Sequence, residues 1–559
     1  LPEGLGPASV VFSSPNRLQG PDNHLVGLML PGAGIGMPEN AMRAERPIPV
    51  GGGLTITLQA DLMGAPGAAD SLAALDRWFE LHGYPEPLAM PRGDARAELA
   101  FSLQGYAKQH ALWNPEWGCW YSDLIVGFHP NREPAHELLI GARILAGGAE
   151  AEQAAALAAE VMGGDQAARD YAVEFRSSAG ALADLAAQAR GLIANQAADG
   201  TWRFSGEHAK AGWTAEVIDY DYLGAEGASE VGLTAPSAAT VLEYALLTGD
   251  PQAEEAGLRA LRAMRRFRVP RAAQVWECPV HSPDILASAV AVNAYLLGYE
   301  LTGDRAHLAD AAYWARTGLP FVYVWSAPDQ PAMQGASIPI FGATSYILSW
   351  LGVAVQWNGM AYAEALRRLA RYDDSFPWER VAENLLVSGM YQQATEGDRL
   401  AQWPDALNFI HGRPGLHGQT PPCFTPTTLV YANLAHRNWW HSAPRIRSVR
   451  HGRDRVALRS AAELSRVEWD GKTLRFEARF AKYQWGAVEA LGVSRPTEVR
   501  VDGRPIPECP DLAAVSAPAW RYHADIGTLE VRLTRPGSAW VEALGVTHAP
   551  VVVVVDRID

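Results

Sequence analysis

One turn sequence occurs twice in the middle of the chain, and it constrains the fold more than any other feature. Thr248-Gly249-Asp250 and Thr302-Gly303-Asp304 each follow an apolar segment and precede an amphipathic one. A Gly that ends one helix and an Asp that begins the next are typical of a compact turn between antiparallel helices. The two copies lie about fifty positions apart, a spacing that indicates a ring of helical hairpins.

The periodicity of apolar residues divides the chain of 559 residues into three predicted zones. Residues 1–67 alternate short apolar runs with Gly and Pro, which predicts a β-rich N-terminal segment. Residues 68–440 carry apolar positions at helical spacing. Residues 441–559 change to period two, and Asp470-Gly471 and Asp502-Gly503 mark hairpin turns. We therefore predict a mainly α fold, an (α/α) toroid of helical hairpins with an N-terminal β segment and a C-terminal antiparallel β-sandwich domain.

Composition excludes several classes of function. The chain has 47 Lys and Arg against 62 Asp and Glu, and the formal net charge of -15 disfavours nonspecific nucleic-acid binding. No apolar run approaches the ~18 residues that span a bilayer. The nucleotide-binding motif GxGxxG and the serine-hydrolase motif GxSxG are absent. We therefore expect no nucleic-acid partner, no membrane partner and no cofactor.

The order of the three zones resembles the (α/α) toroid carbohydrate-active enzymes, namely the six-hairpin glycosidase-like glycoside hydrolases and the toroid polysaccharide lyases. The two Thr-Gly-Asp hairpins, the Asp199-Gly200-Thr201-Trp202 turn and the β-rich C-terminal region carry the likeness. The resemblance implies a carbohydrate substrate and cleavage of glycosidic bonds, but it supplies no catalytic residues. The 19 Trp and 18 Tyr, many of them in polar loops, agree with sugar stacking. The chain begins Leu-Pro-Glu-Gly, a start that is compatible with a trimmed export signal, and we expect a secreted or periplasmic protein.

Two loops carry the candidate catalytic residues, because the loops of a toroid gather on one face. Glu277, His281 and Asp284 lie within eight positions before a predicted helix, where partners of this kind tune a general acid. Alternatively, Asp284 is only the first-turn acid of that helix. Asp219 and Asp221 alternate with tyrosines and lie on one side of an extended segment, as an acid and base for inverting hydrolysis would. A Ca²⁺ site or a hydrogen-bonded loop anchor is the alternative for this pair.

Aromatic, amide, acidic and histidine side chains in other loops are candidates for substrate binding, since rings stack on sugars and polar groups bond hydroxyls. The predicted substrate-binding residues are Trp202, Tyr222, Glu226, Trp325, Gln356, Trp357, Asn358, Asn408, His411 and His417. For each, core packing or an internal hydrogen bond is the alternative. Cys278 and His281 are three positions apart, but without a tight pair on each side we predict no metal site.

These residues predict a glycoside hydrolase that uses loop carboxylates as general acid and base. A polysaccharide lyase remains the alternative, because the Asn, His and Arg of residues 405–419 suit β-elimination from a uronic-acid glycan. A noncatalytic glycan-binding protein is the second alternative. The negative net charge favours hydrolysis, since a polyanionic substrate would more naturally meet a basic cleft. The oligomeric state stays open.

Overall fold

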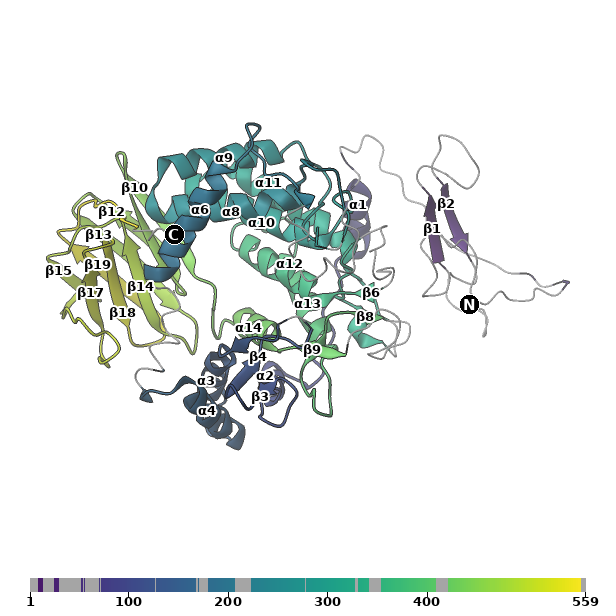
Figure 1. Ribbon diagram of the computed structural model, residues 1–559, viewed down its shortest axis with the longest axis horizontal. Helices are drawn as coiled ribbons and strands as arrows, with labels where there is room; N and C mark the ends of the chain where they lie inside the picture. Colours follow the sequence, from purple (N-terminus) through teal and green to yellow (C-terminus); the bar gives the residue numbers. More distant parts are fainter. Residues whose placement is uncertain are drawn as a thin grey trace.

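Helices occupy most of the first four fifths of the described chain, and strands occupy the C-terminal part (Figure 1). The computed structural model describes residues 9–13, 25–29, 52–53, 55, 70, 72–125, 127–166, 169, 179–206, 223–276, 278–326, 330–340, 353–408 and 421–553. The fold class is the predicted one, mainly α with antiparallel β-sheets at the C-terminal end. Near the N-terminus, strands β1 (Ser9–Ser13) and β2 (Leu25–Met29) form an antiparallel hairpin.

Two helical hairpins confirm the repeated turn. The helices are α8 (Val231–Thr248), α9 (Pro251–Met264), α10 (Ile285–Thr302) and α11 (Arg305–Gly318). Gly249 has a φ of 73° and donates its N–H to the carbonyl of Ala245, which ends α8. Asp250 then accepts hydrogen bonds from two backbone N–H groups in the first turn of α9. Gly303 ends α10 in the same way, with a φ of 72°, and Asp304 accepts one backbone N–H, that of Ala306, in the first turn of α11.

The other helices extend these hairpins into an arc (Figure 1). They are α1 (Ala73–His82), α2 (Ala95–Gln104), α3 (Pro134–Leu145), α4 (Ala149–Met162), α6 (Ala179–Ala194), α12 (Gln356–Leu369), α13 (Trp378–Tyr391) and α14 (Thr427–His436). Helices α8, α10 and α12 pack side by side, and each packs against the helix that follows it. Because every second helix runs in the same direction, the loops that precede α8, α10 and α12 lie at one end of the arc. We call this end the loop end.

Helices α8 and α10 are more deeply buried than the helices that follow them. In α8 and α10 most residues are inaccessible, whereas α9 and α11 expose a polar stripe. Helix α10 also has the length and apolar composition of a membrane-spanning helix, but 67% of it is buried within the protein. A core helix packed on both flanks accounts for this composition.

Short strands tie the loops together at the loop end. Strands β3 (Trp113–Asn114), β4 (Cys119–Tyr121) and β5 (Pro130–Asn131) precede α3 and form one small sheet. Strand β6 (Val353–Ala354) pairs with β8 (Leu407–Asn408), and β7 (Trp403–Pro404) pairs with β9 (Pro422–Phe424). The β6–β8 pair joins the segment before α12 to the segment before α14, and the β7–β9 pair lies within the latter segment. Single turns of 3₁₀ helix, Leu319–Phe321 and Pro331–Met333, lie between α11 and β6.

The C-terminal strands form two five-stranded antiparallel sheets that pack face to face. The strands are β10 (Arg445–His451), β11 (Asp454–Ser460), β12 (Glu463–Trp469), β13 (Thr473–Phe480), β14 (Gly486–Leu491), β15 (Glu498–Val501), β16 (Arg504–Ile506), β17 (Ala519–His523), β18 (Thr528–Leu533) and β19 (Gly537–Leu544). One sheet has the order β10-β11-β14-β18-β17 and the other β12-β13-β19-β15-β16. Their inner faces share one apolar core, to which Leu458 and Phe476 belong. At the β15–β16 turn, Asp502 and Gly503 have φ values of 50° and 76°, as the Asp-Gly signal predicts.

The sheet that begins with β10 contacts both sides of the helical arc. On one side, Arg455 donates a hydrogen bond of 3.2 Å to a carbonyl in α8, and Ala457 joins the helical core. On the other side, Arg96 of α2 donates to the Tyr483 hydroxyl at 2.7 Å. The guanidinium of Arg143 in α3 lies 3.8 Å from the centre of the ring of Trp485. Trp485 and Tyr483 lie in the same loop, between β13 and β14. The β-sheets therefore bridge helices that are far apart in the sequence.

Candidate functional site

Several predicted site residues lie outside the described residues, and their roles stay predictions. They are Asp219, Asp221, Tyr222, Glu277, His411 and His417. Asn408 ends strand β8 and is paired with Val353 of β6, but its side chain is not among those described.

Asp284 caps helix α10. Its Oδ1 accepts the N–H of Ala287 at 2.7 Å, its Oδ2 accepts the N–H of Ala273 at 3.0 Å, and the residue is 1% exposed. Burial raises the pKa of this carboxyl to about 7, although the backbone N–H donors act in the opposite direction. His281, from the same loop, is exposed. This geometry is that of the helix-terminus alternative, and the catalytic role of Asp284 and His281 stays a prediction.

Four predicted substrate-binding residues make internal hydrogen bonds. Trp202 is buried and donates its ring N–H to a carbonyl in α6, and Glu226 accepts a backbone N–H at 2.7 Å. Gln356 and Asn358 are fully buried, and their amides bond the carbonyls or side chains of neighbouring loops. By contrast, Trp325 is 58% exposed. The contacts of the first four match a structural role, and sugar binding by all five stays a prediction.

Trp357 lies in a cluster at the loop end, together with two residues that the sequence did not single out. Its ring stacks on that of Trp276, with centroids 6.1 Å apart and planes inclined by 30°. Its Nε1–H donates a hydrogen bond of 2.8 Å to Oδ1 of Asp405. Trp276 precedes α10, Trp357 is the second residue of α12, and Asp405 precedes α14. We call these three residues the tryptophan–aspartate cluster.

The electrostatic environment of Asp405 favours its protonated form. Burial raises the pKa of Asp405, the charge of Asp123 raises it further, and only the hydrogen bond from Trp357 lowers it. Asp123 precedes α3, and its Oδ1 accepts two backbone N–H groups at 2.7 and 2.9 Å. Its backbone also pairs with Phe424 of β9, which brings this loop to the segment around α14. Two carboxyls in different environments thus lie within electrostatic range of each other, as acid–base pairs do.

The cluster offers ring surface to a ligand. Trp276 is 36% exposed although its ring is stacked, and Trp357 is half-buried. A flat apolar face beside hydrogen-bonding carboxyls suits a sugar ring, which has an apolar face and hydroxyl edges. The sequence analysis did not select Trp276 or Asp405 as site residues. Trp276 directly precedes the candidate Glu277, and Asp405 begins the stretch of residues 405–419. The contacts of Trp276 and Asp405 with Trp357 depend on tertiary packing, for which the sequence carries no local signal.

Metal ligation has little support in the described part of the chain. Cys278 is buried, whereas His281, three positions later, is exposed. Among the described residues, no three His, Cys, Asp or Glu side chains are grouped so as to hold a metal ion.

No protein-family model and no curated protein matches the sequence. Solved structures with a related arrangement include the unsaturated glucuronyl hydrolase of Bacillus sp. GL1, with 16% identity and a TM-score of 0.35 over 61% of this chain and 94% of that one. The unsaturated glucuronyl hydrolase of Streptococcus agalactiae matches with 9% identity and a TM-score of 0.38, over 67% and 97% of the two chains. A GH76 α-mannanase of Bacteroides thetaiotaomicron has 9% identity and a TM-score of 0.29, over 63% and 86%. Both kinds are (α/α) toroid carbohydrate-active enzymes. Likeness of this extent identifies neither the reaction nor the catalytic residues of this chain.

Proposed function

We propose that this chain is a glycoside hydrolase whose active site lies at the loop end, around the tryptophan–aspartate cluster. The observation that carries the proposal is Asp405, a carboxyl of raised pKa that is hydrogen-bonded to one ring of a tryptophan pair and lies near the charge of Asp123. A proton donor beside a stacking surface, with a second carboxylate close by, is what cleavage of a glycosidic bond requires. The proposed substrate is a poly- or oligosaccharide.

In this proposal Asp405 is the general acid. Burial raises its pKa, and in the reaction its proton passes to the glycosidic oxygen as the bond from this oxygen to the anomeric carbon breaks. Asp123 is the general base: it takes a proton from water, and the water oxygen forms the new bond to the anomeric carbon. The two backbone N–H groups that donate to Oδ1 of Asp123 fix the direction of its carboxylate. Trp276 and Trp357 hold the sugar ring by stacking.

The carboxylates predicted from the sequence remain part of the proposal. Glu277 directly follows Trp276 in the chain. Asp219 and Asp221 belong to the segment that precedes α8, which also starts at the loop end. A location outside the cytoplasm, expected for an enzyme that degrades polysaccharides, stays a prediction.

The test is hydrolysis of a panel of oligosaccharides, followed by the release of reducing ends. We expect the wild type to cleave at least one substrate, and Asp405→Asn to lower kcat roughly 10²- to 10⁴-fold, because general acid catalysis contributes about that much. Asp123→Asn should lower kcat as well. Asp374→Asn is the matched control, since Asp374 is an exposed acid in the turn between α12 and α13.

Each other outcome excludes the proposal. Full activity of both Asp405→Asn and Asp123→Asn would exclude this site. Products with unsaturated, ultraviolet-absorbing ends would identify a lyase. Binding of the same oligosaccharides without any cleavage would identify a glycan-binding protein.

A further inference from the structure

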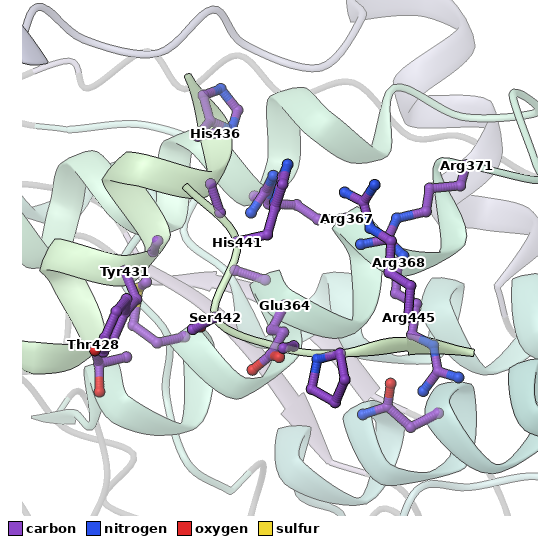
Figure 2. Close-up of a pocket in the computed structure, with 18 of the residues that line it drawn as sticks. Glu364, Arg367, Arg368, Arg371, Thr428, Tyr431, His436, His441, Ser442 and Arg445 are labelled. Atoms are coloured by element: carbon purple, nitrogen blue, oxygen red, sulfur yellow. The ribbon is translucent and has the colours of Figure 1, made fainter. Parts of the chain in front are cut away.

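A separate pocket lies inside the helical arc, toward the end opposite to the loop end (Figure 2). Helices α8, α10, α12, α13 and α14 form its walls, together with residues 441–446, which lead into β10. Its volume is about 550 Å³. Small-molecule sites commonly have volumes of ~300–1,000 Å³, so the pocket is large enough for a ligand of sugar size.

Four arginines gather on one side of this pocket. Arg367 and Arg368 lie in the last turn of α12, and Arg371 lies two positions after its end. Arg445 begins β10 and lies on the same side of the pocket (Figure 2). Arg368 is neutralised by Glu300, at 2.5 Å. Arg367 has a more distant carboxylate partner, Glu379 of α13, at 3.4 Å.

Arg371 and Arg445 are not neutralised in this way. Within the described part of the chain, neither forms an ion pair, and the buried Nε of Arg445 has no hydrogen-bond partner. A guanidinium that is partly withdrawn from water without a paired anion is costly. The carboxylates of Glu300 and Glu463, which pair with Arg368 and Arg479, offset this cost only in part. Two such groups side by side suit a carboxylate or phosphate, which accepts hydrogen bonds from both.

The charges of the arginines also act on neighbouring titratable groups, although burial is the larger cause of each shift. The pKa of His441 is lowered to about 2, first by burial and then by Arg445, Arg367 and Arg371. Burial lowers the pKa of Arg445 to about 10, and the charge of Arg371 adds to this effect. The charges of the arginines therefore add to the effect of burial at both groups, whereas the charge of Glu463 opposes it at Arg445.

The opposite wall of the pocket has a different character. Thr428, Tyr431 and Ser442 bring hydroxyl groups, and Glu364 lies between them and the arginines (Figure 2). Glu364 is exposed to the pocket and forms no ion pair with a described residue. Hydroxyls and a carboxylate bind the hydroxyl groups of a ligand, and a carboxylate on this side repels an anionic group toward the arginines.

We infer that this pocket binds a small hydroxylated anion, such as a sugar acid or a sugar phosphate. Its carboxylate or phosphate lies between Arg371 and Arg445, and its hydroxyl groups face Glu364 and Thr428. The tryptophan–aspartate cluster lies at the other end of α12, so this site does not depend on the proposed function. The negative net charge of the chain is no obstacle, because the arginines are concentrated at one place.

Calorimetric titration tests the inference. The probes are glucuronate for a carboxylate, glucose 6-phosphate for a phosphate, inorganic phosphate for the bare anion and glucose for the neutral sugar. We expect glucuronate or glucose 6-phosphate to bind more tightly than inorganic phosphate, and glucose not to bind. Arg371→Ala should weaken that binding at least tenfold. Arg371 is exposed to the pocket, so this variant should fold.

Two controls separate this site from the rest of the protein. Arg262→Ala removes an exposed arginine of α9 that forms no ion pair with the described residues, and it should leave the affinity unchanged. Asp405→Asn should also leave it unchanged, whatever its effect on hydrolysis. The inference is wrong if neither sugar anion binds, if inorganic phosphate binds as tightly as both, or if Arg371→Ala binds like the wild type.

Discussion

Replacing Asp284 by Asn tests whether burial raises the pKa of this helix-capping carboxyl. The carboxyl is 1% exposed and its pKa is raised to about 7, from an ordinary value of 3.8, because burial outweighs the hydrogen bonds from backbone N–H groups. A raised carboxyl pKa means that the folded state binds the proton more tightly than the unfolded state. The stability that this proton provides is fully present below about pH 4 and is lost as the pH rises through about 7.

The magnitude follows from the two pKa values. They differ by roughly three units, and each unit corresponds to about 1.4 kcal/mol, so the linkage amounts to about 4 kcal/mol. Asn cannot titrate. The difference in unfolding free energy between wild type and Asp284→Asn should therefore shift by about 4 kcal/mol in favour of the variant between about pH 4 and about pH 8.

Urea unfolding of both proteins at several pH values measures this shift, and hydrogen exchange in the first turn of α10 locates it. Asp304→Asn is the matched control, since Asp304 caps α11 from an exposed position, and it should leave the pH profile of the wild type in place. Parallel profiles for wild type and Asp284→Asn would refute the reasoning, because they would mean that the cap stays ionised throughout. Hydrolysis assays of Asp284→Asn distinguish the two predicted roles, because a purely structural cap leaves activity in place and the catalytic role requires its loss.

Three further predictions concern stability. The hydrogen bond from His436 lowers the pKa of Glu383 to about 2, so the ionised Glu383 stabilises the folded state. This stabilisation should be lost as the pH falls from about 4.5 toward 2. Acid unfolding of Glu383→Gln should show no such loss of stability. Arg459→Met leaves the carboxylate of Glu489 without its buried partner at 2.7 Å and should cost about 3–5 kcal/mol in denaturant unfolding; a cost below about 1 kcal/mol would contradict this. Gly335→Ala should lower the thermal midpoint, because Gly335 has a φ of 82° and an added Cβ would collide with a carbonyl oxygen of α13; an unchanged midpoint would contradict this.

The fold could be predicted from the sequence wherever its signals are local. The Gly and Asp of each helical turn act within a few residues, so Gly249 and Asp250 indicate a hairpin without knowledge of the rest of the chain. The Asp502-Gly503 turn is equally local. The class of fold follows from such signals, because helical and period-two segments are separated along the chain.

The site could be predicted only in part, because it depends on contacts between distant segments. Trp357 stood out as an aromatic residue in a polar stretch, but nothing in the sequence relates it to Trp276 or Asp405. The basic pocket was not expected, because the net charge of the chain is a sum over all residues and does not show where the arginines gather. The run Arg367-Arg368, with Arg371 one turn later, was a visible signal for it.

A crystal structure of Asp405→Asn with a bound oligosaccharide tests the central claim most directly. We predict a sugar ring stacked on Trp276 or Trp357, with its glycosidic oxygen within hydrogen-bond reach of the side chain at position 405. A sugar bound away from the loop end, with no contact to the tryptophan–aspartate cluster, would contradict it.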